Sequence, residues 1–442
     1  MMYHSPKLER YFKENNKDII EAIIKDDSEA LSTHVLGSEE ALNQEFGFDD
    51  MYLPRFLSSA PPIVSVAAFF NASNCVQLLI DGGADLKKKD LLGRTILHFA
   101  MASKNLDIVR VCENSLPSSD IKLTTPDDNG NQPMHVACEF GFLDGVKYIY
   151  LNCGSKSLVA LNNSLTLPLL VASYNGHLDI IQYLKSVGIN ILDVDCNGLN
   201  ALHYACAGGQ SEVAKYLIEN GINIDRTGHD SDIPILYAAQ NGNLETVKVL
   251  VEGGSNRYKQ KNAKRSPLIE AAKFGHVDVI KYFVSKGADV NMRNSSDDTA
   301  FSVALDNEQV DVLKYLIQEQ SLSMPAIKKK LILSQSLNKG DYDFFTYLYK
   351  RFAPLTQDQR DYLLNNFSNF SFGFNSKAQK QFKCLEYLLN EGVTFTDDTI
   401  MKFVRCNFYF KNCPKNVKAS LKKMCPDAFT KKNRYSRYCS RW

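Results

Sequence analysis

The chain has 442 residues, a formal net charge of +1, and 44% hydrophobic and 23% charged residues. This composition is ordinary for a soluble folded protein, and a net charge so close to zero does not favour general binding to polyanions such as nucleic acid. No run of 18 apolar residues predicts a membrane span, and the start of the sequence lacks the apolar centre of a signal peptide.

The cysteines indicate a compartment for the protein, and the distribution of charge gives a hint about its partners. The 11 cysteines are scattered without C-x-x-C spacing, which suits reduced thiols in a cytoplasmic protein. Charge is uneven: residues 1–60 carry 6 Lys/Arg and 12 Asp/Glu, whereas residues 326–442 carry 22 and 9. Such asymmetry suggests that the two ends meet different partners.

The N-terminal region, residues 1–60, is predicted to be a helical cap. Ile19, Ile20, Ile23 and Ile24 have helical spacing, a second helix is expected over residues 28–34, and residues 49–62 are expected to form a loop. An end cap is what a stack of repeats requires, because its first repeat would otherwise expose its core face to water.

Residues 61–320 contain a unit that returns eight times. It consists of a turn, a short apolar helix rich in small residues, a second apolar run and a closing glycine. Equivalent alanines, whose numbers rise in steps of 33, 37, 35, 33, 33, 33 and 33, are Ala67, Ala100, Ala137, Ala172, Ala205, Ala238, Ala271 and Ala304. A repeat of about this length with two short helices is the signature of a solenoid.

The amino-acid motif of the unit resembles that of a known family. Residues 90–100 read DLLGRTILHFA, residues 129–137 read NGNQPMHVA, and residues 287–291 read GADVN. This unit resembles that of ankyrin-repeat proteins, D-x-x-G-x-T-P-L-H-x-A-A-x-x-G-H followed by G-A-D-x-N. The acidic cap leading into residues 64–70 is similar to the greatly expanded ankyrin families of parasitic protists. The resemblance implies an all-α solenoid of helix-turn-helix units with short β-turn tips.

Beyond the repeats, residues 321–428 keep the helical rhythm without the motif. Residues 331–337 and 341–349 predict a ninth, degenerate unit, and residues 382–389 predict the second helix of a tenth. A polar, aromatic loop is expected over residues 365–375. Residues 429–442 are predicted to be a basic tail, in which a solvated face is favoured over a polyanion contact.

Catalytic and metal-binding patterns are weak. His98, His135 and His203 occupy the motif's own L-H position, where the family uses histidine for structural hydrogen bonds. Cys138 and Cys206 follow His135 and His203 by three positions, which would suit a Cys–His nucleophile, but both fill the motif's small second-alanine position. The sequence therefore predicts no enzyme activity, no metal and no cofactor.

The resemblance also places a binding surface. Ankyrin proteins bind partners on a concave face made by the turn tips and the ends of the first helices. Carried onto this chain, these positions give Phe70, Leu91, Leu92, Arg94, Phe140, Tyr174, Gln240, Asn241, Arg265, Lys273 and Phe274. The aromatic members suggest interface anchors, unless side chains from the irregular loops cover some of them.

We therefore predict a non-catalytic scaffold or adaptor, monomeric, that binds a protein partner on the concave face. One alternative is an electrostatic adaptor whose basic C-terminal region binds nucleic acid or an anionic membrane, and it predicts strong salt dependence. Another is an enzyme within residues 326–442, but that region contains no histidine.

Overall fold

The structure is a computed structural model that describes residues 14–43, 45–46, 55–116, 121–255, 265–319, 326–339, 341–366, 376–406 and 414–429. It divides into two units, Met1–Asn307 and Glu308–Trp442. Regular structure in the described residues is helical, with two isolated β-bridges, Glu45 to Pro62 and Val194 to Asn200. The all-α prediction is confirmed. No helix in these ranges is long and apolar enough to cross a membrane.

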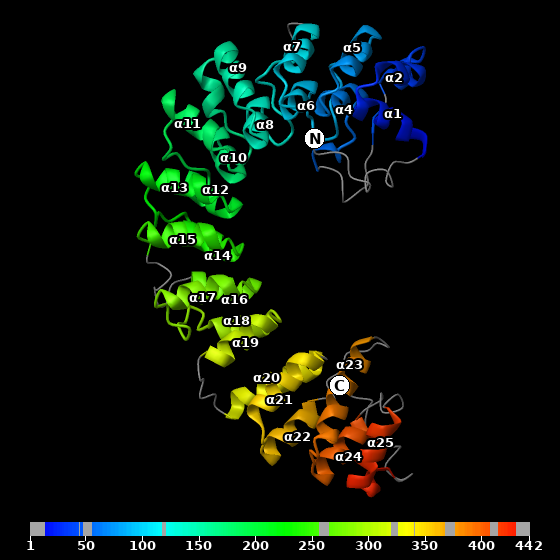
Figure 1. Cartoon of the computed structure of the whole chain (residues 1–442), viewed down its shortest axis with the longest axis vertical. Helices are drawn as coiled ribbons and strands as arrows, with labels where there is room; N and C mark the ends of the chain where they lie inside the picture. Colours follow the sequence, from blue (N-terminus) through cyan, green and yellow to red (C-terminus); the bar gives the residue numbers. More distant parts are fainter. Residues whose placement is uncertain are drawn as a thin grey trace. The chain divides into compact units, whose positions relative to one another are not determined.

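The first unit is a two-layer stack of helix pairs (Figure 1). The first helices form the inner layer and are α4 (Ile63–Phe69), α6 (Ile96–Ala102), α8 (Pro133–Phe140), α10 (Pro168–Asn175), α12 (Ala201–Gly208), α14 (Pro234–Gln240), α16 (Pro267–Phe274) and α18 (Ala300–Asp306). The second helices form the outer layer and are α5 (Ser73–Asp81), α7 (Leu106–Ser115), α9 (Leu143–Cys153), α11 (Leu178–Ser186), α13 (Ser211–Glu219), α15 (Leu244–Glu252) and α17 (Val277–Ser285). Successive first helices contact one another from α4 to α18.

The inner and outer layers differ in how many residues of each helix are apolar and buried. Every residue of α6 is buried, because a first helix touches the repeat before it, the repeat after it and its own partner. Helix α13 buries only Val213, Ala214 and Leu217, and its charged residues face solvent. Pro133, Pro168, Pro234 and Pro267 begin first helices, where a missing N–H costs nothing.

Three α-helices precede the repeats in the described residues: α1 (Glu14–Lys25), α2 (Ser28–Val35) and α3 (Glu39–Leu42). Helix α1 packs on α4 and α2 packs on α5, so this pair continues both layers and covers the open face of the first repeat. The described part of the predicted loop at residues 49–62 contains a short 3-10 helix, η2 (Arg55–Leu57), and residues 49–54 of that loop lie outside the described residues. A second, η3 (Ser155–Val159), follows α9, in one of the two longer repeats.

The turn between the two helices is the same in all eight repeats. One residue there has a positive φ: Asn71 (61°), Lys104 (59°), Gly141 (72°), Gly176 (84°), Gly209 (74°), Gly242 (72°), Gly275 (86°) and Glu308 (61°). Three of these residues are not glycine, although a left-handed backbone costs an L-residue about 1–2 kcal/mol. The stack therefore imposes this turn even where the sequence has lost its usual glycine.

A side chain from the following repeat fills the space beside this turn. A Cβ atom on Gly141 would lie 2.4 Å from the ring of His177, and one on Gly242 would lie 2.4 Å from the ring of His276. The Nε2 atoms of these histidines donate back to Glu139 O at 2.9 Å and Gln240 O at 2.8 Å. Glycine is needed here for both its conformation and its missing side chain.

Buried histidines in the first helices connect a repeat to the repeat that follows it. His98, His135 and His203 reach carbonyl oxygens of the next repeat through Nε2, at 2.9 Å to Asn131, 3.2 Å to Thr166 and 3.3 Å to Asp232. Their Nδ1 atoms accept the backbone N–H three positions earlier, at 3.0–3.2 Å. An Nδ1 that accepts carries no proton, so the rings of His98 and His135 are neutral with the proton on Nε2. The Nδ1 atom of His203 also lies 2.7 Å from Asn200 Oδ1.

The second unit keeps the two-layer pattern. Its helices are α19 (Val310–Glu319), α20 (Ala326–Lys339), α21 (Tyr342–Phe352), α22 (Gln357–Asn366), α23 (Ser376–Asn390), α24 (Asp397–Cys406) and α25 (Lys415–Met424), followed by η6 (Pro426–Phe429). Helices α20, α22 and α24 form one layer, and α21, α23 and α25 form the other. The helices predicted for the ninth and tenth units are present. The predicted loop beyond residue 366 and the basic tail from residue 430 lie outside the described residues.

The histidine contacts predict acid sensitivity. Burial lowers the pKa of His98 and of His203 to about 4, against 6.5 in the unfolded chain. The unfolded chain binds more protons between these values, so stability is complete above pH 6.5 and is lost as the pH falls toward 4, by about 3 kcal/mol per histidine. Urea unfolding followed by circular dichroism from pH 7.5 to 4.5 measures this loss. The H98Q/H203Q variant should lose less stability over the same range; an identical loss contradicts the prediction.

The strained turn of the second repeat predicts a stabilising substitution. Lys104 is exposed and has φ 59°, so Lys104→Gly removes the left-handed penalty and should raise the free energy of unfolding by up to about 1 kcal/mol. Lys215→Gly on α13 is the matched control and should lower it by about 1 kcal/mol, because glycine weakens a helix interior. Thermal unfolding of the two variants tests this, and a destabilised Lys104→Gly protein would be the contrary result.

Candidate functional site

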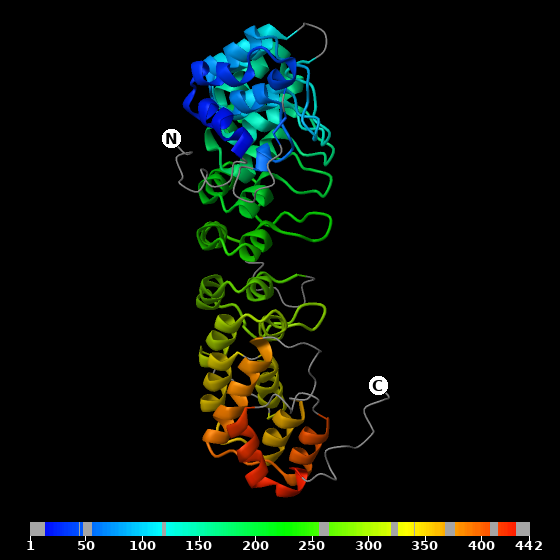
Figure 2. The same ribbon diagram turned by 90° about the vertical axis from the view of Figure 1, so that its right-hand side faces the viewer.

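The candidate site is the face formed by the turn tips and the inner helices of the first unit. Figure 2 shows the tips as a row of loops on one side of the helices. Several tips close on an Asp or Asn side chain: Asp127 Oδ1 accepts the N–H groups of Asn129 and Asn131 at 2.9 and 2.8 Å, and Asp195 Oδ1 accepts those of Asn197 and Leu199 at 2.9 and 2.8 Å. The tips are therefore preorganised.

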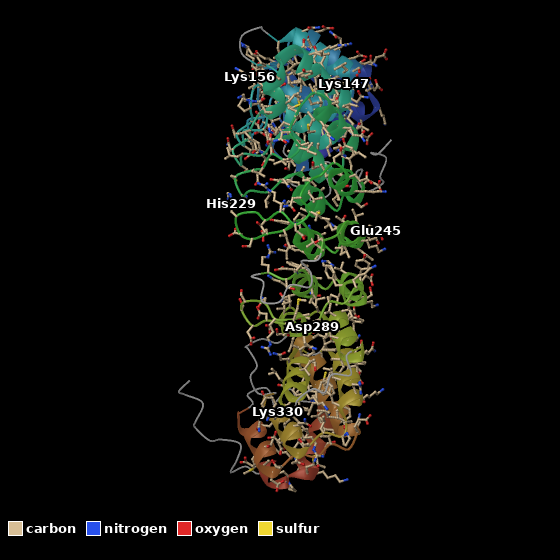
Figure 3. The ribbon with its side chains drawn as sticks, turned by 90° about the vertical axis from the view of Figure 1, so that its left-hand side faces the viewer. Lys147, Lys156, His229, Glu245, Asp289 and Lys330 are labelled. Carbon is tan, nitrogen blue, oxygen red and sulfur yellow. The ribbon has the colours of Figure 1, made fainter. Side chains whose placement is uncertain are left out.

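Backbone hydrogen bonds also join neighbouring tips. Leu91 N donates to Ser59 O, Asp128 N to Leu92 O, Asn163 N to Asn129 O and His229 N to Asn197 O, all at 2.8–2.9 Å. His229 at a tip and Glu245 on an outer helix lie on opposite sides of the unit (Figure 3). A partner on the tip side therefore meets a surface held by its own backbone.

One end of this face is already occupied by the chain itself. The ring of Phe56 on η2 stacks on Phe69 with centroids 5.7 Å apart. It also makes edge contacts with Phe99 at 5.2 Å and Phe140 at 5.1 Å. Phe140 is only half exposed as a result. The expectation that an irregular loop covers part of the aromatic row is correct for Phe140.

Arg94 requires a correction. The sequence predicts that it contacts a partner from a tip, but it is 4% exposed. Its Nε donates to Asp90 Oδ2 at 2.7 Å, and its guanidinium group lies 4.1 Å from the centre of the Phe56 ring. Its Nη2 also donates to the carbonyl oxygen of Phe56. Arg94 therefore holds η2 in place and does not face solvent.

Other predicted residues remain accessible. Leu91 at a tip is 74% exposed, Tyr174 at the end of α10 is 48% exposed, and Phe274 at the end of α16 is 42% exposed. Further members of the set have smaller or polar exposed surfaces: Leu92, Asn241 and Lys273 are exposed, and Phe70, Gln240 and Arg265 are half-buried. The Lys273 ammonium lies 5.5 Å from the Phe274 ring.

Arg265 is half-buried, and its guanidinium group is hydrogen-bonded to neighbouring side chains. It donates to Asp232 Oδ1 at 2.7 Å, to Glu270 Oε1 at 3.1 Å and to Gln240 Oε1 at 3.1 Å. The hydroxyl of Tyr237 donates to the other oxygen of Asp232 at 3.0 Å. This network joins the sixth and seventh repeats and fixes the polar part of the face, so Arg265 and Gln240 act mainly in positioning.

The fifth repeat has small residues where its neighbours have large ones. Ala207 and Gly208 occupy the positions of Tyr174 and Asn175 in the fourth repeat and of Gln240 and Asn241 in the sixth. A Cβ atom on Gly208 would lie 1.9 Å from the carbonyl oxygen of Tyr174. Asn241 Nδ2 donates to Ala207 O at 2.8 Å. The fifth repeat therefore adds no large side chain to the face between the exposed rings of the fourth and seventh repeats.

Two exposed residues were missed by the sequence reasoning. Leu161 and Leu165 flank the tip of the fourth repeat and are exposed. They add apolar surface to that of Leu91 and Leu92 at the second tip. The signal that selected Leu91 and Leu92, an apolar residue where a tip is usually polar, was present at Leu165 as well.

The structure places the suspected nucleophiles in the core. Cys138 and Cys206 are fully buried, and burial raises the pKa of both thiols, so both stay protonated and away from any substrate. Burial also lowers the pKa of His135. Among the described residues, no group of three His, Cys, Asp or Glu side chains could hold a metal ion.

Comparison with known proteins identifies the class. The family model described as ankyrin repeats (3 copies) matches residues 64–160, 156–228 and 235–329, and a second ankyrin model matches residues 212–251. These matches span more than half of the chain, so it belongs to the ankyrin-repeat family.

Individual relatives are more distant. The chain is 33% identical to Alpha-latrotoxin-Lg1a of Latrodectus geometricus over 133 residues, 30% of this chain and 10% of the toxin. It is 31% identical to a putative ankyrin repeat protein of Rickettsia bellii over 27% of this chain and 63% of that protein. It is 28% identical to NF-kappa-B inhibitor alpha of Gallus gallus over 26% and 36%. The chain thus matches about a tenth of the length of the latrotoxin.

The contact of Phe56 with Arg94 predicts that removing the Phe56 ring lowers stability and exposes Arg94. Phe56→Ala removes three aromatic contacts and one cation–π contact, and we expect it to lower the free energy of unfolding by about 2–3 kcal/mol. It should also make Arg94 reactive toward phenylglyoxal, read by mass spectrometry. Phe274→Ala is the control, because its ring is 42% exposed. An Arg94 that stays protected in the Phe56→Ala protein would show that η2 does not cover it.

Proposed function

We propose that this chain is a non-catalytic scaffold that binds a protein partner on the concave face of its first unit, over the fourth to seventh repeats. Ankyrin repeats generally mediate protein–protein interaction. Tyr174 and Phe274 carry this proposal, because both rings are exposed near the ends of first helices three repeats apart. Phe140, which is the equivalent of Phe274 in the third repeat, is instead covered by Phe56.

The chemistry of this surface supports such a role. Exposed aromatic side chains on a rigid support are the usual anchors of protein interfaces. Between the two rings, Ala207 and Gly208 place no large side chain on the face, and their carbonyl oxygens accept from Asn241 Nδ2 and Gln210 Nε2. Asn241 and Lys273 are exposed beside them and can supply a polar rim. The exposed leucines of the tips extend the same face, and we propose that they make secondary contacts.

The relatives support the proposal in general terms. NF-kappa-B inhibitor alpha is named as an inhibitor of NF-kappa-B, and its likeness to part of this chain is consistent with recognition of another molecule. We propose further that the chain is monomeric and acts in the cytoplasm, on the strength of its scattered cysteines.

The aromatic pair gives a direct test. Tyr174→Ala and Phe274→Ala together should weaken partner binding by at least about 2 kcal/mol, roughly 30-fold. Stability should change little, because both rings are largely exposed. The measurement is affinity capture from nuclease-treated native lysate, followed by calorimetric titration of the recovered protein with the full chain and the variant.

A matched control comes from the outer layer. Leu151 on α9 is 80% exposed, so Leu151→Ala removes a comparable apolar side chain from a surface outside the proposed site. A partner that binds the Leu151→Ala protein normally but not the Y174A/F274A protein supports the proposal. A partner retained by the Y174A/F274A protein would place recognition elsewhere on the chain.

A further inference from the structure

The division into two units uncovers a charge separation that the net charge conceals. Residues 1–307 carry 28 Lys/Arg and 38 Asp/Glu, whereas residues 308–442 carry 23 and 12. The whole chain has a net charge of +1, yet the second unit by itself is strongly basic. A basic domain with clustered cations is the electrostatic footprint of a polyanion-binding protein.

Four of these cations lie on α25, the last α-helix described (red in Figure 1). This helix reads KNVKASLKKM and contains no acidic residue. Lys415, Lys418 and Lys422 follow one another at helical spacing and share one face. The opposite face buries Val417 and Leu421. Lys415, Lys422 and Lys423 are exposed and Lys418 is half-buried, so the four lysines form a ridge along the outer side of the helix.

A second helix extends this ridge. Helices α23 and α25 pack together, and Asn416 Nδ2 donates to a carboxylate oxygen of Glu386. That bond brings the start of α25 to the middle of α23, one turn away from Lys383. Lys380 and Lys383 are both exposed. Glu386 is the nearest acidic group on α23, and Asn416 already occupies one of its oxygens. The ridge then comprises six lysines from two helices.

We propose that this ridge, made of Lys380, Lys383, Lys415, Lys418, Lys422 and Lys423, binds the phosphate backbone of nucleic acid without sequence preference. Phosphates spaced along a strand match cations spaced along a helix, and the release of condensed counterions drives such binding. The ridge presents charge but no set of base-reading side chains, so contacts to phosphate position the strand and do not specify it.

An anionic membrane fits the ridge less well. A helix that lies in a membrane surface inserts an apolar face among the lipids. The apolar side chains of α25 are instead buried against its own unit: Leu421 is 0% exposed, and Cys425 and Ala428 beyond it are also buried. The only exposed apolar residue of this helix is the small Ala419. The sequence from Thr430 to Trp442 adds five Lys/Arg and no acid, which increases the attraction to a polyanion.

The test uses the full chain and a fluorescein-labelled 20-base-pair duplex of mixed sequence, with fluorescence anisotropy at 50–200 mM KCl. Six phosphate contacts predict a slope of about −5 in log affinity against log salt. The K415Q/K418Q/K422Q variant should bind at least tenfold more weakly at 100 mM and reduce the slope by about 3. The K415R/K418R/K422R variant should bind like the parent, because it keeps every charge.

The matched control removes three exposed lysines from the first unit, Lys122, Lys156 and Lys215, each replaced by Gln, and should leave binding unchanged. Circular dichroism and thermal unfolding confirm that each variant is folded. The proposal is overturned if the full chain fails to bind the duplex at 50 mM salt, if it binds phosphatidylserine vesicles but no duplex, or if the K415Q/K418Q/K422Q protein keeps full affinity while a chain ending at Phe429 loses it.

Discussion

The stack depends on the hydrogen bonds that neutral, buried imidazole rings make between successive repeats. A single repeat has two short helices and too little apolar surface to fold alone, so it must be tied to its neighbours with fixed geometry. His98, His135 and His203 do this by accepting a backbone N–H of their own repeat at Nδ1 and donating to a carbonyl oxygen of the next at Nε2. A charged ring would lose the first of these bonds, and burial keeps the ring neutral. The regular stack then holds the tips and inner helices in register, which gives the proposed binding face its rigidity.

The fold could be predicted almost completely from the sequence because its determinants lie within one period. Turn residues, small residues and the L-H position all recur at the spacing of the repeat. The accessibility of the site could not be predicted in the same way. Arg94 and Phe140 are covered by Phe56, which belongs to no repeat and lies far earlier in the chain than either of them. Conversely, Asn71, Lys104 and Glu308 keep the left-handed turn without glycine, since neighbouring repeats override the local preference.

The two proposed surfaces differ in physical character. On the first unit, a rigid backbone presents two aromatic rings beside amides and one lysine, which suits a specific partner of complementary shape. On the second, lysines on two packed helices present charge with little shape. Specific recognition should therefore depend weakly on salt and strongly on single side chains, whereas contact with a polyanion should behave in the opposite way. The near-zero net charge of the chain is the sum of an acidic first unit and a basic second unit.

The side chain that packs against a left-handed turn limits which insertions and deletions the stack can accept. The turn residue and the side chain that covers it come from successive repeats at Gly141 and His177, Gly176 and Gln210, and Gly209 and Asn243. Where the turn residue is Asn71, the covering residue Asn105 hydrogen-bonds to its side chain at 2.7 Å. A duplication or deletion of one whole period restores both members of every pair wherever the cut falls. A change of any other length must be absorbed after a second helix, as in the two longer repeats. The surface offered to a partner can thus grow or shrink by whole repeats without disturbing the packing.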